Sequence, residues 1–513
     1  MPSDSGNTTS VWMETKLPDF APLGQNIRVN VCIVGAGIAG MTAAYLLART
    51  GRAVVVIDDG PIAGGETGRT TAHLTAALDD RYYEIEKLYG SDGAKIAAAS
   101  HTAAIDRVET IVSIEDIDCD FERLDGYLFL GGDSKKEDLQ RELEATHRAG
   151  LRTTELVDRT PIPSFDSGVA LRFPRQAAFH PLKYLNGLAR AILRDGGKIY
   201  CRTHAEQIED GEPAKVTTAG GHVITADNII VATNTPVNDW LIIHSKQEAY
   251  RTYVIGARVP TGSVPRGLYW DTPDPYHYIR LQSADDAAHE ILIVGGEDHK
   301  TGQGNDQEDH FACLEQWSRE RFPMIESIDY RWSGQVMEPV DYMAYIGKNP
   351  GSDRHIFIAT GDSGNGMTHG TIAGILLTDL VLGLKNPWTE LYDPSRIELR
   401  SAPEYVRANI NVVGQYADWL TAGELEDEKE IAPGAGAVLR RGKRKVAVYR
   451  DESGELHECS AVCPHLGCIV NWNPVEKSWD CPCHGSRFNA YGGVINGPAI
   501  SDLEPAEASA QKE

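Results

Sequence analysis

The apolar positions near the start of the chain change from a strand pattern to a helix pattern and back. Residues 29–34 are a short apolar run, residues 35–40 are glycine-rich, and residues 42–50 are rich in Ala and Leu. A second β-branched run, residues 53–57, ends at Asp58. This order predicts a strand, a tight turn, a helix and a second strand, which together form one βαβ unit.

Helical and strand patterns alternate through the middle of the chain. From residue 251 to residue 294 the pattern is that of strands, which favours the antiparallel sheet of a second domain. A later apolar strand runs through a glycine-rich turn into a helix, so elements of the first kind return after this sheet. The elements expected are helices at residues 82–114, 136–149, 187–194 and 371–383, and strands at residues 228–232, 253–258, 276–281, 290–294 and 355–359.

These patterns divide the chain into three parts. Residues 28–395 are expected to form an α/β domain, with a second sheet inserted at about 250–325. Residues 396–429 contain a helical run at 405–420 and then charged and Pro-Gly positions, and are interpreted as a linker. Residues 430–513 carry short strands between Gly and Pro turns, which predicts a small β domain. The predicted fold class is therefore α/β plus all-β.

Composition and charge exclude several classes of protein. The 513 residues are 42% hydrophobic and 24% charged, as in an ordinary soluble globular protein. Lys and Arg number 49 and Asp and Glu 74, so the net charge is −25, which disfavours nucleic acid and anionic lipid as main partners. Residues 1–27 lack a signal-peptide pattern, and the longest apolar stretch, residues 371–384, is too short to span a bilayer. We therefore expect a cytoplasmic protein without an integral membrane segment.

Three glycines mark a candidate nucleotide-binding turn. Gly35, Gly37 and Gly40 match G-x-G-x-x-G, in which the first allows a tight turn, the second lets a pyrophosphate approach the backbone and the third lets helix and strand pack closely. Asp58, at the end of the next strand, can accept a hydrogen bond from a ribose hydroxyl. The alternative, a glycine-rich turn without a ligand, is disfavoured by the strand before the motif and the helix after it. FAD and NAD both remain open on these residues.

Three later segments extend this motif into a resemblance to a family. Together with residues 35–58, residues 64–70, 334–347 and 356–371 resemble the D-amino-acid-oxidase-like FAD oxidoreductases, which include glycine oxidase, sarcosine oxidase and the glutamyl-putrescine oxidases. The resemblance covers about residues 28–395, and it implies a Rossmann-like FAD-binding domain with an inserted mixed-sheet substrate domain above the flavin. Its late glycine motif selects FAD over NAD. The FAD-binding residues that it implies are Gly35, Gly37, Gly40, Asp58, Thr67, Arg69, Thr70, Gly361, Gly364, Asn365, Gly366 and Met367.

The late glycine-rich turn, residues 361–370, also has a physical reading. It can offer backbone N–H groups and the positive end of the following helix to negative charge on a reduced flavin. A plain connection between strand and helix is the alternative. Because no second G-x-G-x-x-G with the right spacing occurs, we do not expect a separate NAD(P)H domain.

Two departures from the family pattern narrow the expected chemistry. Where some relatives carry a histidine that binds flavin covalently, this chain reads Thr67-Gly68-Arg69-Thr70, so we expect non-covalent FAD. Where the sarcosine-oxidase branch has a lysine, Met367-Thr368 stands instead, so a free amino-acid carboxylate is not the group expected to be recognised. No catalytic base is assigned, because lone histidines such as His73, His180 and His369 are more often packing or surface residues.

The nine cysteines are unevenly distributed along the chain. Five of them fall between Cys459 and Cys483, which indicates a metal site more than a set of disulfides. Two short motifs, C-x-H at 463–465 and C-x-x-H at 481–484, each supply one Cys and one His. Zinc sites usually pair like with like, whereas this mixed pairing suits a [2Fe–2S] cluster with two thiolates on one iron and two imidazoles on the other.

The two motifs and their surroundings, about residues 430–510, resemble the Rieske domain. The resemblance implies that Cys463 and Cys481 bind one iron, and that His465 and His484 bind the other. A zinc site is the alternative.

Further residues of this region receive roles from the same resemblance. It implies a disulfide between Cys468 and Cys483 that ties the two loops together, and a proline loop at Gly497-Pro498 that covers the cluster. Ser486 stands where respiratory Rieske proteins place a hydroxyl donor, whereas Phe488 stands where many of them have a tyrosine. One hydrogen bond that raises the reduction potential is then missing, so we expect a lower potential than in those proteins.

The two implied cofactors suggest that the enzyme takes two electrons from its substrate and passes them on one at a time. Flavin accepts two electrons as hydride, whereas a [2Fe–2S] cluster carries one. We therefore expect an FAD-dependent dehydrogenase that oxidises an amine-type C–N bond of a small molecule and sends electrons through the cluster to a quinone, a cytochrome or a ferredoxin. Two alternatives stay open: the cluster feeds the flavin for a reduction or oxygenation, or the chain is a non-catalytic redox sensor or electron carrier.

The inserted sheet supplies candidate substrate contacts. We expect Tyr250, Tyr276, Tyr278 and Arg280 to line a pocket above the flavin. Tyr276 and Tyr278 share one face of a strand by its period of two. Packing is the alternative, because alternating aromatic residues also favour a half-buried strand.

Overall fold

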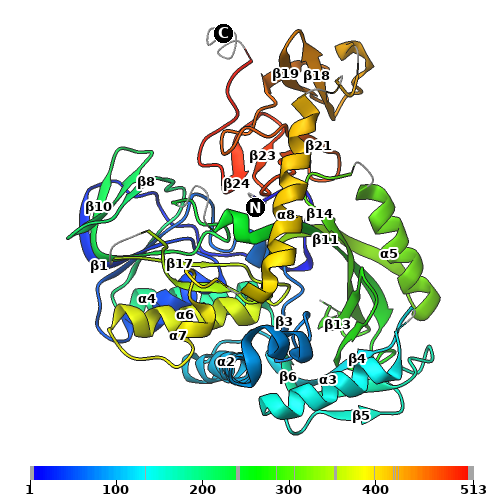
Figure 1. Ribbon diagram of the computed structural model, residues 1–513. Helices are drawn as coiled ribbons and strands as arrows, with labels where there is room; N and C mark the ends of the chain where they lie inside the picture. The colour runs from blue at the N-terminus through cyan, green and yellow to red at the C-terminus, as the bar shows by residue number, and fades with distance from the viewer. Residues whose placement is uncertain are drawn as a thin grey trace.

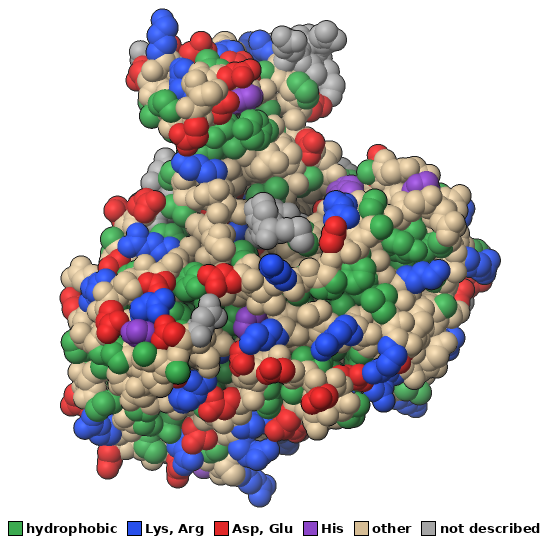
Figure 2. Space-filling view, turned by 180° about the vertical axis from the view of Figure 1, so that it is seen from behind, with side chains coloured by type: hydrophobic (Ala, Val, Ile, Leu, Met, Phe, Trp, Pro, Cys, Tyr) green, Lys and Arg blue, Asp and Glu red, His purple; other side chains and the backbone are tan. Residues whose placement is uncertain are grey.

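The computed structural model describes residues 5–132, 134–238, 243–284, 286–304, 307–351, 355–397, 399–419, 421, 423–425 and 427–506. Leu420, the predicted last residue of the linker helix, and residues 507–513 of the predicted C-terminal domain lie outside these ranges. Figure 1 shows a large lower body with two sheets and their helices, and a small lobe of strands above it. Seen from behind, acidic and basic side chains are interspersed over both parts, and the small lobe is set off from the body by a narrower waist (Figure 2).

The first sheet has eight strands and a parallel centre. Its order is β16-β17-β10-β1-β2-β7, with β9 paired to β10 and β8 to β9. β1 pairs in parallel with β2 and β10, and β10 with β17. The strands are β1 (Ile27–Val34), β2 (Val54–Ile57), β7 (Lys198–Tyr200), β8 (Ala205–Glu209), β9 (Ala214–Thr218), β10 (Val223–Val231), β16 (Tyr345–Lys348) and β17 (Ile356–Thr360).

Both faces of this sheet are covered, which explains its apolar strands. Val31 and Ile33 pack in one core with helices, whereas Cys32 and Val34 face the other way into a core with β8 and β9. Every residue of β2 is buried for the same reason. The helices of the first core are α1 (Ile38–Ala48), α2 (Tyr82–Glu115), α4 (Pro181–Arg194) and α6 (Gly366–Val381).

The second sheet has nine strands, mostly antiparallel. Its order is β15-β11-β14-β13-β12-β4-β6-β3, with β5 paired to β6, and β12 with β4 is a parallel pair. The strands are β3 (His73–Leu74), β4 (Glu122–Phe129), β5 (Glu155–Val157), β6 (Ala170–Ala178), β11 (Gln247–Pro260), β12 (Leu268–Asp271), β13 (His277–Ser283), β14 (His289–Lys300) and β15 (Ser327–Pro339). Helices α3 (Lys136–Ala149) and α5 (Gln307–Arg321) lie beside it (Figure 1). The sheet is wider than the predicted insertion of residues 250–325, because strands from residues 73–178 and β15 pair at its two ends.

The small lobe is all-β. A three-stranded sheet, β18-β19-β20, and a four-stranded sheet, β21-β22-β23-β24, enclose a core that contains Trp472, Trp479 and Phe488. Helix α8 (Ala402–Gln415) runs from the lower body to this lobe (Figure 1). The strands are β18 (Ala435–Arg441), β19 (Arg444–Arg450), β20 (Leu456–Ser460), β21 (Asn471–Asn473), β22 (Ser478–Asp480), β23 (Arg487–Asn489) and β24 (Val494–Asn496). The predicted fold class, α/β plus all-β, is confirmed.

Short helical turns complete the fold. They are α7 (Thr389–Tyr392) and the 3-10 turns η1 (Val11–Glu14), η2 (Glu66–Arg69), η3 (His244–Lys246), η4 (Leu399–Ser401), η5 (Tyr416–Trp419) and η6 (Glu428–Glu430). Among those that contact the C-terminal lobe, η2 and η3 lie at the sites described below. Within the ranges that the structure describes, no helix is long and apolar enough to cross a membrane.

Candidate functional site

A cavity of about 300 Å³ lies between the two large sheets and reaches the small lobe. One part of its wall comes from the turns after β1, β2 and β17, and another from one face of the second sheet. Residues of both large sheets and of the small lobe therefore meet at one cavity. The small lobe contributes Val494, Ile495, Asn496, Gly497 and Ala499.

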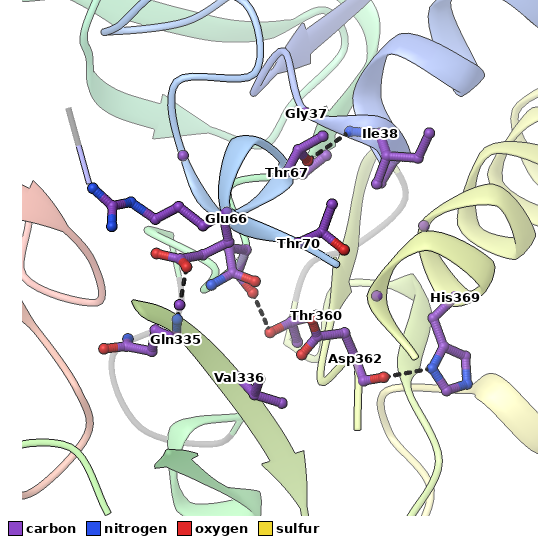
Figure 3. A pocket seen from close by; sticks show the side chains of 18 of the residues that line it. Gly37, Ile38, Glu66, Thr67, Thr70, Gln335, Val336, Thr360, Asp362 and His369 are labelled. Atoms are coloured by element: carbon purple, nitrogen blue, oxygen red, sulfur yellow. Dashed lines mark hydrogen bonds between the residues drawn. The ribbon is translucent and has the colours of Figure 1, made fainter. Parts of the chain in front are cut away.

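The glycine motif forms the first end of the cavity. Gly35 and Gly37 line it, and α1 begins at Gly37 without a side-chain cap. The backbone N–H of Ile38 donates to Thr67 Oγ1 at 3.1 Å, which fixes η2 beside the first turn of α1 (Figure 3). Gly40 has a packing role, because a Cβ there would lie 2.0 Å from the carbonyl oxygen of Gly35. An uncapped helix N-terminus that opens into a cavity fits the anionic pyrophosphate of a dinucleotide.

Asp58 lies beside this turn at the cavity wall. Its carboxylate accepts hydrogen bonds from the backbone N–H groups of Ala36 at 2.6 Å and Gly60 at 2.8 Å. Burial and the neighbouring charge of Asp59 raise the pKa of Asp58 to about 7. The acid predicted at the end of the second strand therefore stabilises the turn as well as lining the cavity.

The late glycine turn forms the opposite end of the cavity. Gly361, Gly364, Asn365, Gly366 and Met367 all line it. Gly364 has φ +68°, and a Cβ there would lie 1.9 Å from Asp79 Oδ2, so only glycine fits. Helix α6 begins here without a side-chain cap, which leaves a second positive helix end at the cavity.

Three histidines that the sequence left unassigned are neutral, of which His180 and His369 are buried and His73 is half-buried. Burial lowers the pKa of His73 to about 3, and those of His180 and His369 to about 4. His73 and His369 line the cavity, whereas His180 does not. His369 Nδ1 donates to the carbonyl oxygen of Asp362 at 2.7 Å (Figure 3). Because all three imidazoles are neutral at physiological pH, none of these histidines supplies a fixed positive charge.

The second sheet presents aromatic and acidic side chains to the cavity. The Tyr276 hydroxyl donates to Asp79 Oδ2 at 3.1 Å, and the rings of Tyr276 and Tyr278 lie 5.5 Å apart. Asp298 Oδ1 is buried and has no hydrogen-bond partner among the described residues. Burial raises the pKa of Asp79 to about 6 and that of Asp298 to about 7. Ionised carboxylates beside aromatic faces suit a cationic ligand.

Two of the four predicted substrate residues lie elsewhere. Tyr250 is outside the cavity wall, and Lys300 Nζ lies 5.9 Å from its ring centroid. Arg280 is 2% exposed and donates to the carbonyl oxygens of Ala72 at 3.0 Å and Phe179 at 3.1 Å. The guanidinium therefore ties strands of the second sheet to neighbouring turns, and is not available to a substrate.

Arg69 takes a position that the sequence did not indicate. Arg69 and Thr70 line the cavity, but the Arg69 guanidinium points to the C-terminal lobe, where Nη1 lies 3.1 Å from Glu476 Oε1. Among the described residues of the cavity wall, Arg69 is the only Lys or Arg. With its charge paired to Glu476, no Lys or Arg of this wall is left to bind a substrate carboxylate.

The cysteine and histidine motifs lie in two facing loops of the C-terminal lobe. Cys463, His465, Cys481 and His484 are all buried, and the two imidazole rings are 5.0 Å apart. The thiols of Cys463 and Cys481 are within hydrogen-bonding contact of each other. His484 Nδ1 is buried and has no hydrogen-bond partner in the described part of the chain. Two facing thiols, two facing imidazoles and an unpartnered ring nitrogen fit the ligand set of a [2Fe–2S] cluster.

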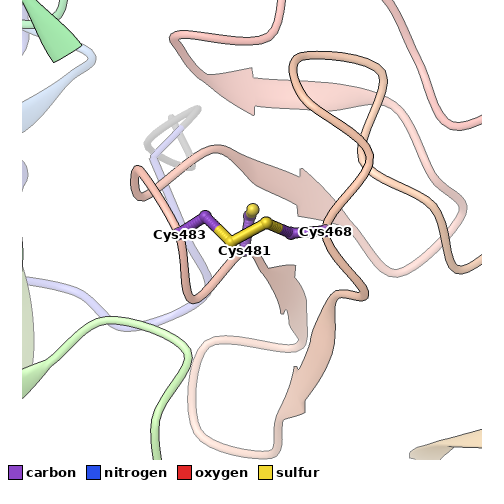
Figure 4. Close-up of side chains that lie close together, drawn as sticks. All are labelled: Cys468, Cys481 and Cys483. Carbon is purple, nitrogen blue, oxygen red and sulfur yellow. A yellow bond between two sulfur atoms is a disulfide. The ribbon is translucent and has the colours of Figure 1, made fainter. Parts of the chain in front are cut away.

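The two loops have matching backbone turns and are joined covalently. Gly467 N donates to the carbonyl oxygen of Cys463 at 2.9 Å, and Gly485 N to that of Cys481 at 3.1 Å. A disulfide joins Cys468 to Cys483 across the loops (Figure 4). The pairing that the Rieske resemblance implied is therefore formed, and it fixes the spacing between the two motifs.

The histidine side of these loops faces the large body. The ring of His244, in η3, lies 5.1 Å from His465 and 6.5 Å from His484. Gln335 in β15 lines the cavity and donates from Nε2 to the carbonyl oxygen of Gly485 at 2.9 Å. The cavity and the cluster loops are therefore joined through one side chain.

Sequence reasoning missed several of these residues. Asp79, Thr252, Trp270 and Gln335 line the cavity but belong to no motif that was recognised. Asp298 could have been found, because it lies four positions after the apolar strand predicted at residues 290–294, in a chain region already assigned to the second sheet.

The fold and the two sites together define an FAD-dependent oxidoreductase joined to an iron–sulfur domain. The chain matches the FAD dependent oxidoreductase (DAO) family over residues 30–380 and the Rieske [2Fe-2S] domain over residues 421–507. It belongs to the DAO family of FAD-dependent oxidoreductases and carries a C-terminal Rieske domain. FAD is the cofactor of the first part and a [2Fe–2S] cluster that of the second.

Relatives share either the whole arrangement or its first part. The Rieske 2Fe-2S iron-sulfur protein YhfW of Bacillus subtilis is 35% identical over 495 residues, which are 96% of each chain. Gamma-glutamylputrescine oxidoreductase of Escherichia coli is 29% identical over 72% of this chain and 87% of its own. The crystal structure of glycine oxidase from Geobacillus kaustophilus has a TM-score of 0.60 at 18% identity, and the match covers 72% of this chain and 99% of that one.

Proposed function

We propose that this enzyme oxidises a cationic amine at a C–N bond and passes the electrons through the Rieske cluster to a one-electron acceptor. The observation that carries the proposal is the single cavity whose wall includes residues 494–497 of the Rieske domain beside the glycine turns of the FAD domain. FAD would accept two electrons as a hydride, and the [2Fe–2S] cluster would transfer electrons one at a time. Sites that share a wall suit direct exchange between them.

The proposed FAD site uses the residues at both ends of the cavity. The N-terminus of α1, with Gly35 and Gly37, would hold the pyrophosphate, and Asp58 the ribose. The N-terminus of α6 would face the flavin ring and favour its reduced, negatively charged form. The other residues assigned to the site are Gly40 by packing, and Thr67, Arg69, Thr70, Gly361, Gly364, Asn365, Gly366 and Met367 at or beside the wall.

The proposed cluster ligands are the two thiols and two imidazoles of the facing loops. Cys463 and Cys481 would bind one iron, and His465 and His484 the other. The ligand assignment is supported by their burial and by the disulfide that fixes the two loops. His244 and Gln335 would hold this side of the cluster against the FAD domain.

The proposed substrate is an amine that carries positive charge and needs no carboxylate. Support comes from Asp79 and Asp298, two half-buried acids beside Tyr276 and Tyr278 in the cavity wall. Their raised pKa values show that each carboxylate would gain from a cation in the cavity. The Escherichia coli relative, gamma-glutamylputrescine oxidoreductase, is named for an amine, which supports an amine as the substrate class.

Turnover with two different acceptors tests this function. The holoenzyme is assayed with putrescine, γ-glutamylputrescine, benzylamine and sarcosine, once with oxygen alone and once with ferricenium under argon. We expect at least one amine to be oxidised with ferricenium, and peroxide release in oxygen to account for a small fraction of that rate. Peroxide release at the full rate, with no gain from ferricenium, would contradict the proposed route through the cluster. A failure of every amine to reduce the enzyme would favour the reverse flow of electrons.

A further inference from the structure

One short turn of the FAD domain is held by the Rieske domain at two points. In η2, the Arg69 guanidinium lies 3.1 Å from Glu476 Oε1, and Glu66 Oε1 accepts from Asn496 Nδ2 at 3.1 Å. Glu476 lies between β21 and β22 and Asn496 ends β24, so both partners belong to the C-terminal lobe. Two residues separate Glu66 from Arg69, and both side chains contact that lobe although both residues also line the cavity.

The Glu476 contact is a fully buried charge network. Its carboxylate also lies 3.1 Å from Arg251 Nη2, accepts from Thr8 N at 3.0 Å and is hydrogen-bonded to Ser333. Burial alone would raise the pKa of Glu476, but the charges of Arg69, Arg251 and Arg487 hold it well below its usual range. Loss of this one carboxylate would leave buried guanidinium groups without their counter-charge.

The same turn also forms part of the cavity wall assigned to the FAD site. Thr67 Oγ1 accepts from Ile38 N at the start of α1, and Thr67 and Thr70 both line the cavity. Glu66 Oε2 accepts from Gln335 N at 2.7 Å, which ties the turn to β15 in the cavity wall. A shift of η2 would therefore move the wall where the proposed FAD site lies.

We propose that Glu476 and Asn496 of the Rieske domain are positioning residues for FAD, which hold η2 in its binding conformation so that tight flavin binding requires the docked Rieske domain. The inference rests on the proposed assignment of Thr67 and Thr70 to the FAD site. It does not depend on the substrate or on the direction of electron flow, because binding of FAD is measured without an amine.

FAD release from the holoenzyme tests the inference. The variants are Glu476→Gln and Asn496→Asp, the second of which places a carboxylate against Glu66. The matched control is Glu458→Gln, a Rieske-domain glutamate that pairs with Arg441 at the surface. On dilution, flavin fluorescence gives the Kd of FAD. We expect Kd to rise about tenfold or more in both variants, because Glu476→Gln disturbs a buried ion pair of η2 and Asn496→Asp places a second carboxylate against Glu66 in a half-buried contact. It should stay within twofold in the control.

A double-mutant comparison separates positioning from general instability. Arg69→Met and Glu476→Gln should each raise the Kd of FAD, and together they should raise it by much less than the product of the two effects, because both act through one contact. Retention of the Rieske EPR spectrum shows that the C-terminal domain is folded. If the Glu476→Gln variant does not fold, the Kd of FAD in the Asn496→Asp variant tests the inference by itself. An unchanged Kd in a folded Asn496→Asp or Glu476→Gln variant would overturn the inference.

Discussion

At the scale of residues, the described cavity wall carries two half-buried acids, Asp79 and Asp298, and no Lys or Arg of that wall is free to neutralise them. Asp79 accepts one hydrogen bond from Tyr276, and Asp298 Oδ1 has no partner among the described residues. A bound cation would offset part of the free-energy cost of desolvating these carboxylates. The acid–aromatic wall therefore predicts selectivity for charge, independently of which amine is the substrate.

Replacement of Asp298 tests this selectivity. Asp298→Asn should weaken the binding of choline, a permanent cation, about tenfold or more, because a charge-assisted contact is lost. Binding of 3,3-dimethyl-1-butanol, its uncharged analogue, should change little. Both are measured by perturbation of the flavin absorbance of the oxidised holoenzyme. The control is Asp286→Asn, an exposed acid between β13 and β14. Equal weakening for the two ligands would refute the charge argument.

The binding of the same cation should depend on pH. The pKa of Asp298 is raised to about 7 by burial, so the carboxyl is protonated and neutral at lower pH. A cation binds the ionised form, so affinity should be greatest above pH 7 and fall as the pH decreases through 7, by about tenfold between pH 8 and pH 6. Choline has no proton to lose in this range, and Asp298→Asn should flatten the profile. A profile that is the same in wild type and variant would assign the dependence to another group.

The sequence predicted individual residues well where spacing determines the chemistry. Gly35, Gly37 and the paired motifs at 463–465 and 481–484 are local patterns whose function follows from neighbouring positions. Arg280 shows the limit, because its three carbonyl partners come from other parts of the chain and remove it from the cavity. The two-residue period of a strand shows that Tyr276 and Tyr278 lie on the same side of it. It does not show which part of the molecule packs against that side.

At the scale of elements, the close approach of α1 and α6 brings the two helix N-termini to one cavity. Gly374 in α6 allows this contact, because a Cβ there would lie 2.4 Å from Thr42 Cγ2 in α1. Gly370 likewise faces Ile38. The small residues of α6 therefore set the distance between the two ends of the proposed FAD site.

Addition of one methyl group between these helices should destabilise the FAD domain. Gly374→Ala is expected to lower the free energy of unfolding by about 1–3 kcal/mol, the usual cost of overpacking. Gly414→Ala in α8 is the control: no atom lies within 4 Å of its added Cβ, so the higher helix propensity of Ala should leave stability unchanged or raise it by up to about 1 kcal/mol. Denaturant titration measures both. Thr42→Ser should restore part of the loss, and equal effects of the two Gly→Ala changes would contradict the packing argument.

The disulfide between the cluster loops should stabilise the Rieske domain. It joins cysteines 15 positions apart, for which loop-closure entropy gives about 3 kcal/mol. The double variant Cys468→Ser/Cys483→Ser should therefore lose its cluster at a lower guanidinium concentration than the wild type. The visible absorbance of the cluster measures this loss. Cys459→Ser, which replaces a buried free thiol of the same domain, is the control. A midpoint as high as that of the wild type would show that the loops are held by their other contacts.

Element types followed closely from the pattern of apolar residues, but pairing between distant strands did not. The helix predicted at residues 136–149 has the same bounds as α3, and the strand at residues 355–359 overlaps β17. The second sheet was placed at residues 250–325 because its long strands are consecutive there. β4 and β6 also join it, through the parallel pair of β12 with β4, which no local pattern indicates.

At the scale of the whole molecule, the Rieske domain is docked with its histidine side against the FAD domain. His465 and His484 lie against the ring of His244, and Gln335 joins the cavity to the loop of His484. The sequence could not predict this docking, since Arg69 and Glu476 are 407 positions apart. No sequence motif indicates that these two residues contact each other. The domain boundaries at 395 and 430 remain predictions.

The most direct test of the account is an anaerobic titration of the holoenzyme with the amine panel, followed by EPR and flavin absorbance. The account predicts that at least one amine bleaches the flavin and that the EPR signal of the reduced Rieske cluster, with its low average g value, grows in the same sample. The signal should be independent of protein concentration, because electrons pass within one chain. A bleached flavin beside a cluster that only dithionite can reduce would contradict the proposed path of the electrons.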